Sequence, residues 1–439
     1  MKPNESLFSQ PDNKIPVFVL LVSVYDDAGK EKECLKSLDE LKKLAETSID
    51  DDGHYSVFFC LTQCRKSPDT ATFIGRGKAD EAKKLCSGNN ISLVIADGEM
   101  SPSQIKNLED ALNTEDSEIK VIDRTMLILD IFAKHAVTGE GKIQVEIAQL
   151  KYTAPRLTGR GINLSRQGGT SGSIGARGPG ETKLETDKRH IQRRILSLKN
   201  ELAELEKERA VKRAKRQKSG IPTVAITGYT NAGKSTLLNY LTNAGILAED
   251  KLFATLDTTV RRLTLPSSRE ILLTDTVGFI NNLPHGLVEA FKSTLDEVVY
   301  ADVLLIVIDI SDEDAKLKLE VTEKTLEELG ASGKPTVYAF NKSDLVGFED
   351  TNTFPSDVYG VSISAETGKG VDKLLEILDM VLSASKKRIK LLIPFGDSSA
   401  VNYLYRNAVV ESAEYTENGT LVTALVSDKE IGACKKYII

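Results

Sequence analysis

The chain contains 439 residues, and at about 150 residues per domain this length predicts roughly three domains. Hydrophobic residues make up 41% and charged residues 28%, a balance that excludes wholesale disorder and is typical of packed domains. The net charge of −7 argues against a general-purpose nucleic-acid coat, although such an average conceals local basic patches.

The first segment, residues 1–14, is polar and has no signal-peptide pattern. No apolar run in the chain reaches the roughly 18 residues that a membrane-spanning helix needs. The five cysteines lack paired CxxC spacing, so we expect neither a disulfide framework nor a zinc ribbon. A metal shared by His54, Cys60 and Cys64 is less plausible than ordinary strand packing. We therefore expect a soluble cytoplasmic protein without a membrane span.

Residues 1–122 alternate between apolar runs and helix-like segments. The apolar runs occupy residues 17–24, 57–61 and 91–95, and the helix-like segments occupy residues 32–45, 79–85 and 103–112. This alternation predicts a small N-terminal α/β domain with a mainly parallel sheet.

Residues 123–220 have a different pattern, which predicts a helical arm. Residues 125–152 form a predicted helix, interrupted near Thr138-Gly139, and a glycine-rich loop follows at residues 159–180. The second predicted helix, residues 181–217, has an apolar seam formed by Ile191, Ile195, Leu198, Leu202 and Leu205. Since this seam spans too few heptads for a free coiled coil, we expect the two helices to pair as a hairpin with the loop at its tip.

Residues 221–385 alternate again and predict a second α/β domain. We expect strands at residues 223–227, 260–265, 270–274, 303–308, 336–340 and 358–363, with helices between most of them. Residues 386–439 open with an apolar run and contain Asn418-Gly419, a strong hairpin signal. The tail is therefore predicted to be a small α+β domain.

A phosphate-binding pattern, GxxxxGK[ST], follows the first strand of this second region. It reads Gly228-Tyr229-Thr230-Asn231-Ala232-Gly233-Lys234-Ser235, and a helix-forming run begins at Thr236. Glycines let backbone N–H groups turn toward phosphate oxygens, and the helix N-terminus adds partial positive charge. Lys234 is expected to bridge the outer phosphates and the Ser235 hydroxyl to ligate Mg²⁺. The candidate nucleotide contacts here are Gly228, Asn231, Ala232, Gly233, Lys234, Ser235 and Thr236.

A second motif, Asp275-Thr276-Val277-Gly278, ends the strand at residues 271–274. Asp275 can hold Mg²⁺ through water, and the Gly278 N–H can face the γ-phosphate. Taken alone, Asp275 is equally compatible with a helix N-cap.

Two further motifs predict a guanine site. Asn341-Lys342-Ser343-Asp344 follows a strand, and the Asp344 carboxylate can accept hydrogen bonds from the N1 and 2-amino groups of guanine. Adenine presents an acceptor and no amino group there, a mismatch that discriminates by as much as roughly 10⁴ to 10⁵-fold. Asn341 is expected to brace the neighbouring loops, and the Lys342 stem to lie over the base. Ser364-Ala365-Glu366 is expected to place a backbone N–H at the guanine 6-oxo group.

The order and spacing of these four motifs resemble the TRAFAC class of P-loop GTPases, and flanking residues resemble the HflX family. The family-like stretches are residues 252–257, 275–280, 283–285, 290–295, 121–125, 128–133 and, most specifically, residues 177–187. The resemblance runs from about residue 17 to residue 383. Thr258 stands where the family usually has proline, so the resemblance favours Thr259 over Thr258 as the switch I ligand of Mg²⁺. The loop also carries an apparent extension at residues 165–173.

The resemblance implies a Ras-like P-loop GTPase domain at residues 221–385. It is preceded by the α/β domain and its hairpin arm, and followed by the α+β domain. Lys234, Thr259 and Gly278 are expected to support hydrolysis, with Mg²⁺ held by Ser235 and Thr259. Phe279 occupies the position of the water-orienting glutamine of Ras-type enzymes, so we expect slow intrinsic turnover that a partner stimulates. His285 is a conceivable replacement, and a structural role beside Pro284 is the alternative.

The expected partner is the ribosome, chiefly its large subunit and RNA. Residues 209–218 and the arginines Arg156, Arg160, Arg166 and Arg177 form a basic set, which is either a solvated helix end or an RNA-contacting surface. HflX proteins bind the large subunit and can separate stalled ribosomes under stress, so the resemblance implies that activity. We expect the protein to be a monomer.

The alternatives are a GTP-dependent regulator of a protein partner, a ribosome-assembly factor without splitting activity, a P-loop ATPase, or a scaffold without turnover. Some HflX proteins also use ATP through the N-terminal domain. Gly75-Arg76-Gly77-Lys78 is too short to indicate such a second phosphate site.

Overall fold

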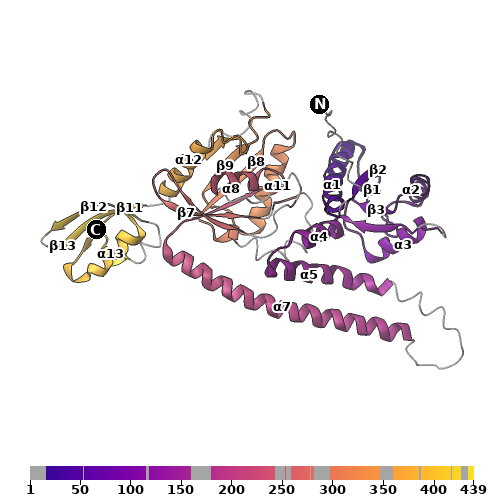
Figure 1. Cartoon of the computed structure of the whole chain (residues 1–439), viewed down its shortest axis with the longest axis horizontal. Coiled ribbons are helices and arrows are strands. Elements are labelled where there is room, and N and C mark those ends of the chain that lie inside the picture. Colours follow the sequence, from indigo (N-terminus) through magenta and orange to yellow (C-terminus); the bar gives the residue numbers. More distant parts are fainter. Residues whose placement is uncertain are drawn as a thin grey trace, which may run out of the picture. The chain divides into compact units, whose positions relative to one another are not determined.

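The computed structural model describes residues 16–52, 54–114, 118–159, 179–242, 253, 259–276, 278–280, 297–346, 359–384, 387–416, 418–426 and 434–439. Residues 160–178, Thr258 and His285, which the sequence analysis singled out, lie outside this set. Contacts divide the chain into two compact units. The first comprises residues 1–202, 251–253 and 282–290, and the second comprises residues 203–250, 254–281 and 291–439. Figure 1 labels the elements.

The first unit contains a four-stranded parallel sheet. Its strands are β1 (Pro16–Tyr25), β2 (Tyr55–Cys64), β3 (Leu93–Ala96) and β4 (Lys120–Asp123), in the order β2-β1-β3-β4. Strand β1 is central, and four consecutive residues from Val19 to Val22 are fully buried because both faces of a parallel sheet are covered. The predicted parallel α/β domain is confirmed. Strand β4, which has only four residues, was not predicted from the sequence.

Helices cover both faces of this sheet. Helix α1 spans Glu31–Asp51, α2 spans Arg76–Asn89 and α3 spans Pro102–Leu112. Leu20 and Val22 share a core cluster with residues of α2 and α3. Since successive side chains alternate between faces, Val19 and Leu21 point to the other side of β1, where α1 packs. Ser101 caps the start of helix α3 and forms a capping box with Gln104. Pro102 occupies the first helical position.

The arm begins with α4 (Arg124–His135) and α5 (Gly139–Thr153), which are separated near Thr138 as predicted. Thr138 caps α5 by accepting a hydrogen bond from Gly141 N at 3.0 Å. Helix α7 (Pro179–Ser219) lies alongside α5 in Figure 1. Arg194 of α7 donates two hydrogen bonds to Glu146 of α5, at 2.7 and 3.0 Å. Leu198 of the predicted seam is almost fully buried, so these two helices form the expected hairpin.

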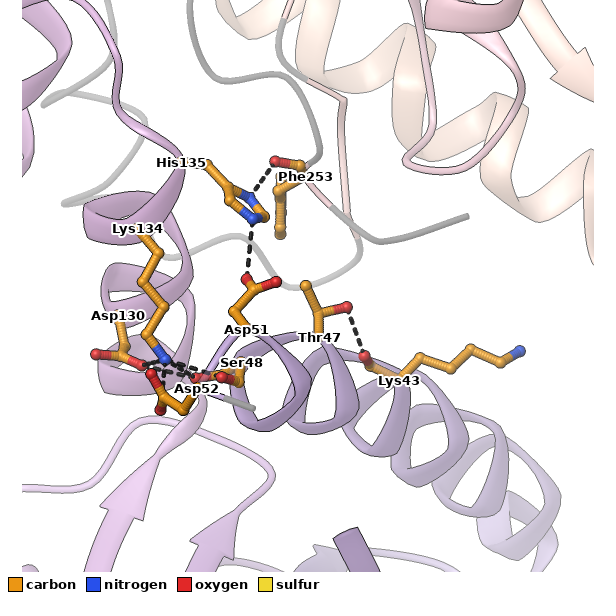
Figure 2. Close-up of polar contacts among 9 residues, drawn as sticks. All are labelled: Lys43, Thr47, Ser48, Asp51, Asp52, Asp130, Lys134, His135 and Phe253. Carbon is orange, nitrogen blue, oxygen red and sulfur yellow. Dashed lines mark hydrogen bonds and ion pairs between the residues drawn. The ribbon is translucent and has the colours of Figure 1, made fainter. Parts of the chain in front are cut away.

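Phe253 belongs to the first unit, although it precedes the switch I threonines in sequence. Its ring packs edge-on against Phe132 of α4, with the centroids 4.7 Å apart. His135 Nδ1 lies 2.8 Å from the Phe253 carbonyl oxygen, and His135 Nε2 lies 3.0 Å from Asp51 Oδ2. Figure 2 shows the imidazole between these two acceptors. Phe253 has φ of 60°, a left-handed conformation that is uncommon for a bulky residue and needs tertiary contacts to hold it.

The second unit contains the six predicted strands of the central α/β region. They are β5 (Thr223–Gly228), β6 (Val260–Thr264), β7 (Glu270–Asp275), β8 (Val303–Asp309), β9 (Thr336–Asn341) and β10 (Tyr359–Ser362). The order is β10-β9-β8-β5-β7-β6, and β6 alone runs antiparallel to its neighbour. Helices α8 (Lys234–Thr242), α11 (Ala315–Glu328) and α12 (Val371–Ala384) complete the described part of this Ras-like fold.

The C-terminal residues form a small α+β structure, as predicted. Strands β11 (Lys387–Ile393), β12 (Val409–Thr416) and β13 (Gly419–Val426) form an antiparallel sheet in the order β11-β13-β12. Helix α13 (Ser398–Asn407) contributes Leu404 to a separate core cluster with Leu391 and Val422. Short 3₁₀ helices occupy Ala28–Lys30, Ala154–Gly159, Phe395–Asp397 and Lys435–Tyr437. None of the helices in the described ranges is long and apolar enough to cross a membrane.

Candidate nucleotide site

The four motifs gather at one edge of the second sheet. Strands β5, β7, β8 and β9 run parallel, so their carboxyl ends share this edge. The P-loop follows β5, Asp275 ends β7 and Asn341 ends β9. Ligands of open α/β sheets bind at such an edge.

The P-loop connects β5 to the first turn of α8, where Lys234, Ser235 and Thr236 lie. Gly233 has φ of 90°, and a Cβ built there would lie 2.1 Å from Asn341 Nδ2. Both its conformation and its surroundings therefore require glycine. Asn231 also has a positive φ, of 61°, and its side chain is exposed.

Lys234 is buried beneath the loop, with 5% of its surface exposed. Its Nζ donates a hydrogen bond to the Tyr229 carbonyl oxygen at 2.7 Å. Burial lowers the pKa of Lys234 to about 8, and the nearby Asp275 carboxylate opposes that shift. An incoming phosphate would restore the charge that burial disfavours.

The segment after β7 crosses directly over the P-loop. Phe279 N donates to Gly228 O at 3.1 Å, and Thr230 N donates to Phe279 O at 2.8 Å. A Cβ at Gly278 would lie 2.8 Å from Lys234 Nζ and 2.9 Å from Thr230 Cα, so only glycine permits this approach. Phe279 is 2% exposed, so its side chain belongs to the core and does not face solvent.

The residues expected to hold Mg²⁺ fit a hard cation with oxygen ligands. Asp275 is fully buried at the end of β7, and its amide donates to Thr259 O at 3.0 Å. That bond fixes Thr259 beside Asp275. The Thr259 hydroxyl is shielded from solvent and has no hydrogen-bond partner in the described ranges. A buried hydroxyl of this kind is a suitable oxygen donor for a cation.

Asn341 connects two loops of the site. Its Nδ2 donates to Ala232 O of the P-loop at 2.8 Å, and its Oδ1 accepts from Ala365 N at 2.9 Å. The Ala365 amide is thus occupied within the protein and is not directed to a ligand here. In the same turn, the buried Ser364 accepts hydrogen bonds from the Thr367 and Gly368 amides, through its hydroxyl and its carbonyl oxygen respectively.

Lys342 and Asp344 lie in the turn after β9. Asp344 is exposed, so its carboxylate is accessible to a ligand. Lys342 Nζ lies 2.7 Å from Asp309 Oδ2 at the end of β8. Asp309 was not predicted from the sequence, although a carboxylate directly after the apolar run at residues 303–308 was an available signal.

Two arginines of the predicted basic set, Arg156 and Arg213, are partly buried and have partners within the protein. Arg156 donates to Asp123 Oδ2 at 3.4 Å and to Met100 O at 2.9 Å, and its guanidinium lies 3.4 Å from the centroid of the Tyr152 ring. Tyr152 donates to the same Asp123 carboxylate; burial, reinforced by that charge, raises the pKa of the Tyr152 hydroxyl.

Arg213 of α7 lies 3.9 Å from the centroid of the Tyr300 ring and 3.8 Å from Glu297 Oε1. Arg213 and Arg156 therefore have internal partners. A guanidinium that is paired and stacked within the protein is less available to RNA phosphates than an exposed one.

Four family models match the chain in succession. They are the GTP-binding GTPase N-terminal region at residues 35–133, the GTP-binding GTPase middle region at residues 135–216, the 50S ribosome-binding GTPase at residues 223–342 and the HflX C-terminal domain at residues 356–432.

Curated relatives match nearly the whole chain. GTPase HflX of Caldanaerobacter subterraneus subsp. tengcongensis is 47% identical over 428 residues, which cover 98% of this chain and 94% of that protein. GTPase HflX of Escherichia coli K12 is 40% identical over 408 residues, covering 92% and 91% respectively. A crystal structure of a GTP-binding protein from Sulfolobus solfataricus with GDP aligns with 84% of this chain and 99% of its own, at 25% identity and a TM-score of 0.42. On the sequence matches, this chain belongs to the HflX family of GTPases.

Proposed function

We propose that this GTPase binds the large ribosomal subunit in the cytoplasm and separates stalled ribosomes into subunits, with GTP hydrolysis ending each cycle. The observation that carries the proposal is the match of residues 223–342 to the family described as 50S ribosome-binding GTPases. Helix α7 supports it, since the basic side chain of Lys212 is exposed. Such charges bind RNA phosphates by counterion release.

The nucleotide site supplies positioning and electrostatics, the two things that phosphoryl transfer needs from a protein. Lys234 would bridge the outer phosphates, and the Gly278 amide would meet the γ-phosphate. Asp344 would read the N1 and 2-amino groups of guanine. Since the Ala365 amide is bonded to Asn341, the next amide, that of Glu366, is the better donor to the 6-oxo group.

Ser235, Thr259 and, through water, Asp275 would hold Mg²⁺, which neutralises charge that develops on the phosphates. The Thr259→Ala variant should bind GTP less tightly in Mg²⁺ and equally well in EDTA. Matched Thr258→Ala and Thr255→Ala variants test the other hydroxyls of this stretch. Loss of the Mg²⁺ effect in one of those variants alone would move the ligand away from Thr259.

The core experiment measures GTP hydrolysis with and without purified large subunits, using ATP and Lys234→Ala as controls. We expect slow intrinsic turnover, because the buried Phe279 side chain cannot orient water, and strong GTP-selective stimulation by the large subunit. Unstimulated turnover would leave the GTPase intact and reject the ribosomal partner.

A second measurement separates splitting from the alternatives. Intact ribosomes incubated with the protein and a non-hydrolysable GTP analogue should sediment as separate subunits in a sucrose gradient. Stimulated hydrolysis without separation would indicate an assembly or storage factor. Stimulation by a protein partner free of RNA would favour a GTP-dependent regulator.

A further inference from the structure

Asp309 and Lys342 form an ion pair beside the expected guanine position. Lys342 Nζ lies 2.7 Å from Asp309 Oδ2, and 27% and 17% of the two side chains are exposed. An ion pair with this exposure contributes little to overall stability. Its geometry, however, determines where the four-carbon stem of Lys342 lies.

The carboxylate of Asp309 is itself held in place. Its second oxygen, Oδ1, accepts hydrogen bonds from Ser311 N at 3.0 Å and from Ser311 Oγ at 2.6 Å. Asp309 also lies opposite Asn341 in the β8–β9 register, and Ile310 N donates to Asn341 O at 3.1 Å. Asp309 is thus fixed at the sheet edge to which the nucleotide would bind, with one oxygen directed to Lys342.

Lys342 has a backbone conformation that makes such an anchor useful. Its φ is 62°, in the left-handed region that residues with a Cβ rarely adopt. The backbone is held on both sides, because Ser343 N donates to Ile363 O at 3.1 Å and Leu345 N donates to Lys342 O at 3.0 Å. With the backbone and Nζ both fixed, the stem between them has few conformations left.

We propose that Asp309 is a positioning residue for guanine recognition, which acts by holding Lys342 stretched where its stem covers one face of the base. This inference rests on the proposed role of Lys342 and Asp344 in the guanine site. A free lysine side chain loses much of its rotamer freedom when a ligand immobilises it. Asp309 removes that cost before GTP or GDP arrives, which is how preorganisation raises affinity.

A double-mutant cycle on the full chain tests the proposal, with GDP affinity measured by calorimetric titration. The Asp309→Asn variant should raise the Kd for GDP about tenfold, and the same substitution in a Lys342→Ala background should change it less than about twofold. Glu313→Gln is the matched control, since Glu313 lies in the same turn and its side chain is exposed. It should leave the Kd unchanged, and thermal unfolding verifies that each variant is folded.

The Kd for inosine diphosphate, which lacks the 2-amino group of guanine, distinguishes the loss of base covering from a change in how the base edge is recognised. Asp309→Asn should weaken GDP and inosine diphosphate binding by the same factor, because a base-covering stem does not contact the base edge. Asp344→Asn should reduce the preference for GDP over inosine diphosphate. Equal losses on Asp309→Asn with and without Lys342, or no loss at all, would overturn the proposal. An unchanged preference in Asp344→Asn would instead reject the guanine assignment itself.

Discussion

Lys234 illustrates how the environment of one residue affects nucleotide binding. Its ammonium lies under the P-loop, its Nζ donates to the Tyr229 carbonyl, and burial lowers its pKa from 10.5 to about 8. Because the pKa is lower in the folded state, the folded protein carries the full desolvation cost below about pH 8. That cost is relieved between about pH 8 and pH 10.5, where the folded state has fewer bound protons than the unfolded state.

Nucleotide affinity should therefore fall as the pH rises through about 8. Phosphates bind the protonated lysine, and the free protein must regain a proton before it can bind them. The Kd for GDP should rise about threefold between about pH 7 and pH 8.3, a window in which the guanine N1 proton is largely retained. Fluorescence titration with a labelled GDP measures this change. In Lys234→Ala the residual binding should be insensitive to pH, and a flat profile in the unmodified protein would refute the argument.

For the candidate site, the sequence predicted a set of residues but not how their polar atoms are paired. The P-loop, Asp275 and the Asn341–Asp344 turn were recognisable because their residue types and spacing follow directly from phosphate and guanine chemistry. The bond from Ala365 N to Asn341, and the Asp309–Lys342 pair, join residues 24 and 33 positions apart. Such pairings depend on sheet register, which a motif does not contain.

Among the helices, α7 shows that neighbouring basic residues can have different surroundings. Lys212 is exposed, whereas the next residue, Arg213, stacks on Tyr300 at 3.9 Å and pairs with Glu297. The sequence pattern alone gives both residues the same interpretation. Only the exposure and contacts of each side chain distinguish them.

Charge reversal at these two positions should give different outcomes. Lys212→Glu should weaken ribosome co-sedimentation and reduce the slope of log affinity against log salt by about one for each lost phosphate contact, with unfolding unaffected. Arg213→Glu should lower thermal stability, because it places like charges beside the buried Glu297. Equal salt slopes for the Lys212 variant and the unmodified protein would show that this face of α7 does not contact RNA.

Of residues 252–257, which precede the expected switch I threonine, the structure describes Phe253. Its ring packs against Phe132 of α4. Phe253→Ala removes a ring that is 3% exposed and lies 4.7 Å from Phe132, so unfolding of the first unit should require about 3 to 5 kcal/mol less. Phe253→Leu, which keeps most of the apolar volume, should lose less than half of that. Calorimetry measures both variants, and identical values for the two would show that the packed ring is not the source of stability.

The elements themselves were largely predictable, because hydrophobic periodicity and capping are local. The break between α4 and α5 was indicated by Thr138-Gly139, and the β12–β13 hairpin by Asn418-Gly419. Strand β4 was missed because its Lys120–Asp123 segment is short and directly precedes a helix that Asp123 caps. The four-domain division at residues 122, 220 and 385 stays a prediction.

For the whole molecule, the proposed nucleotide site lies within one of the two compact units, so nucleotide binding should stabilise that unit directly. Every residue proposed to bind GTP, from Gly228 to Glu366, belongs to the second unit. A ligand stabilises only the cooperative unit that it binds, unless the units unfold together. The way heat unfolds the chain therefore reports how strongly its two halves are coupled.

Calorimetry with and without GDP should resolve two transitions, of which GDP raises one. At a GDP concentration 100 times its Kd, the stabilisation is about 2.7 kcal/mol, which corresponds to a Tm increase of about 5 to 10 °C for a unit of this size. Lys234→Ala should abolish the shift, and Phe253→Ala should lower the other transition, which assigns each to its unit. If GDP raises both transitions together, the binding energy is shared across the chain. In that case nucleotide binding in the second unit affects the stability of the first unit without any partner, and the ribosome is not needed to couple the two units.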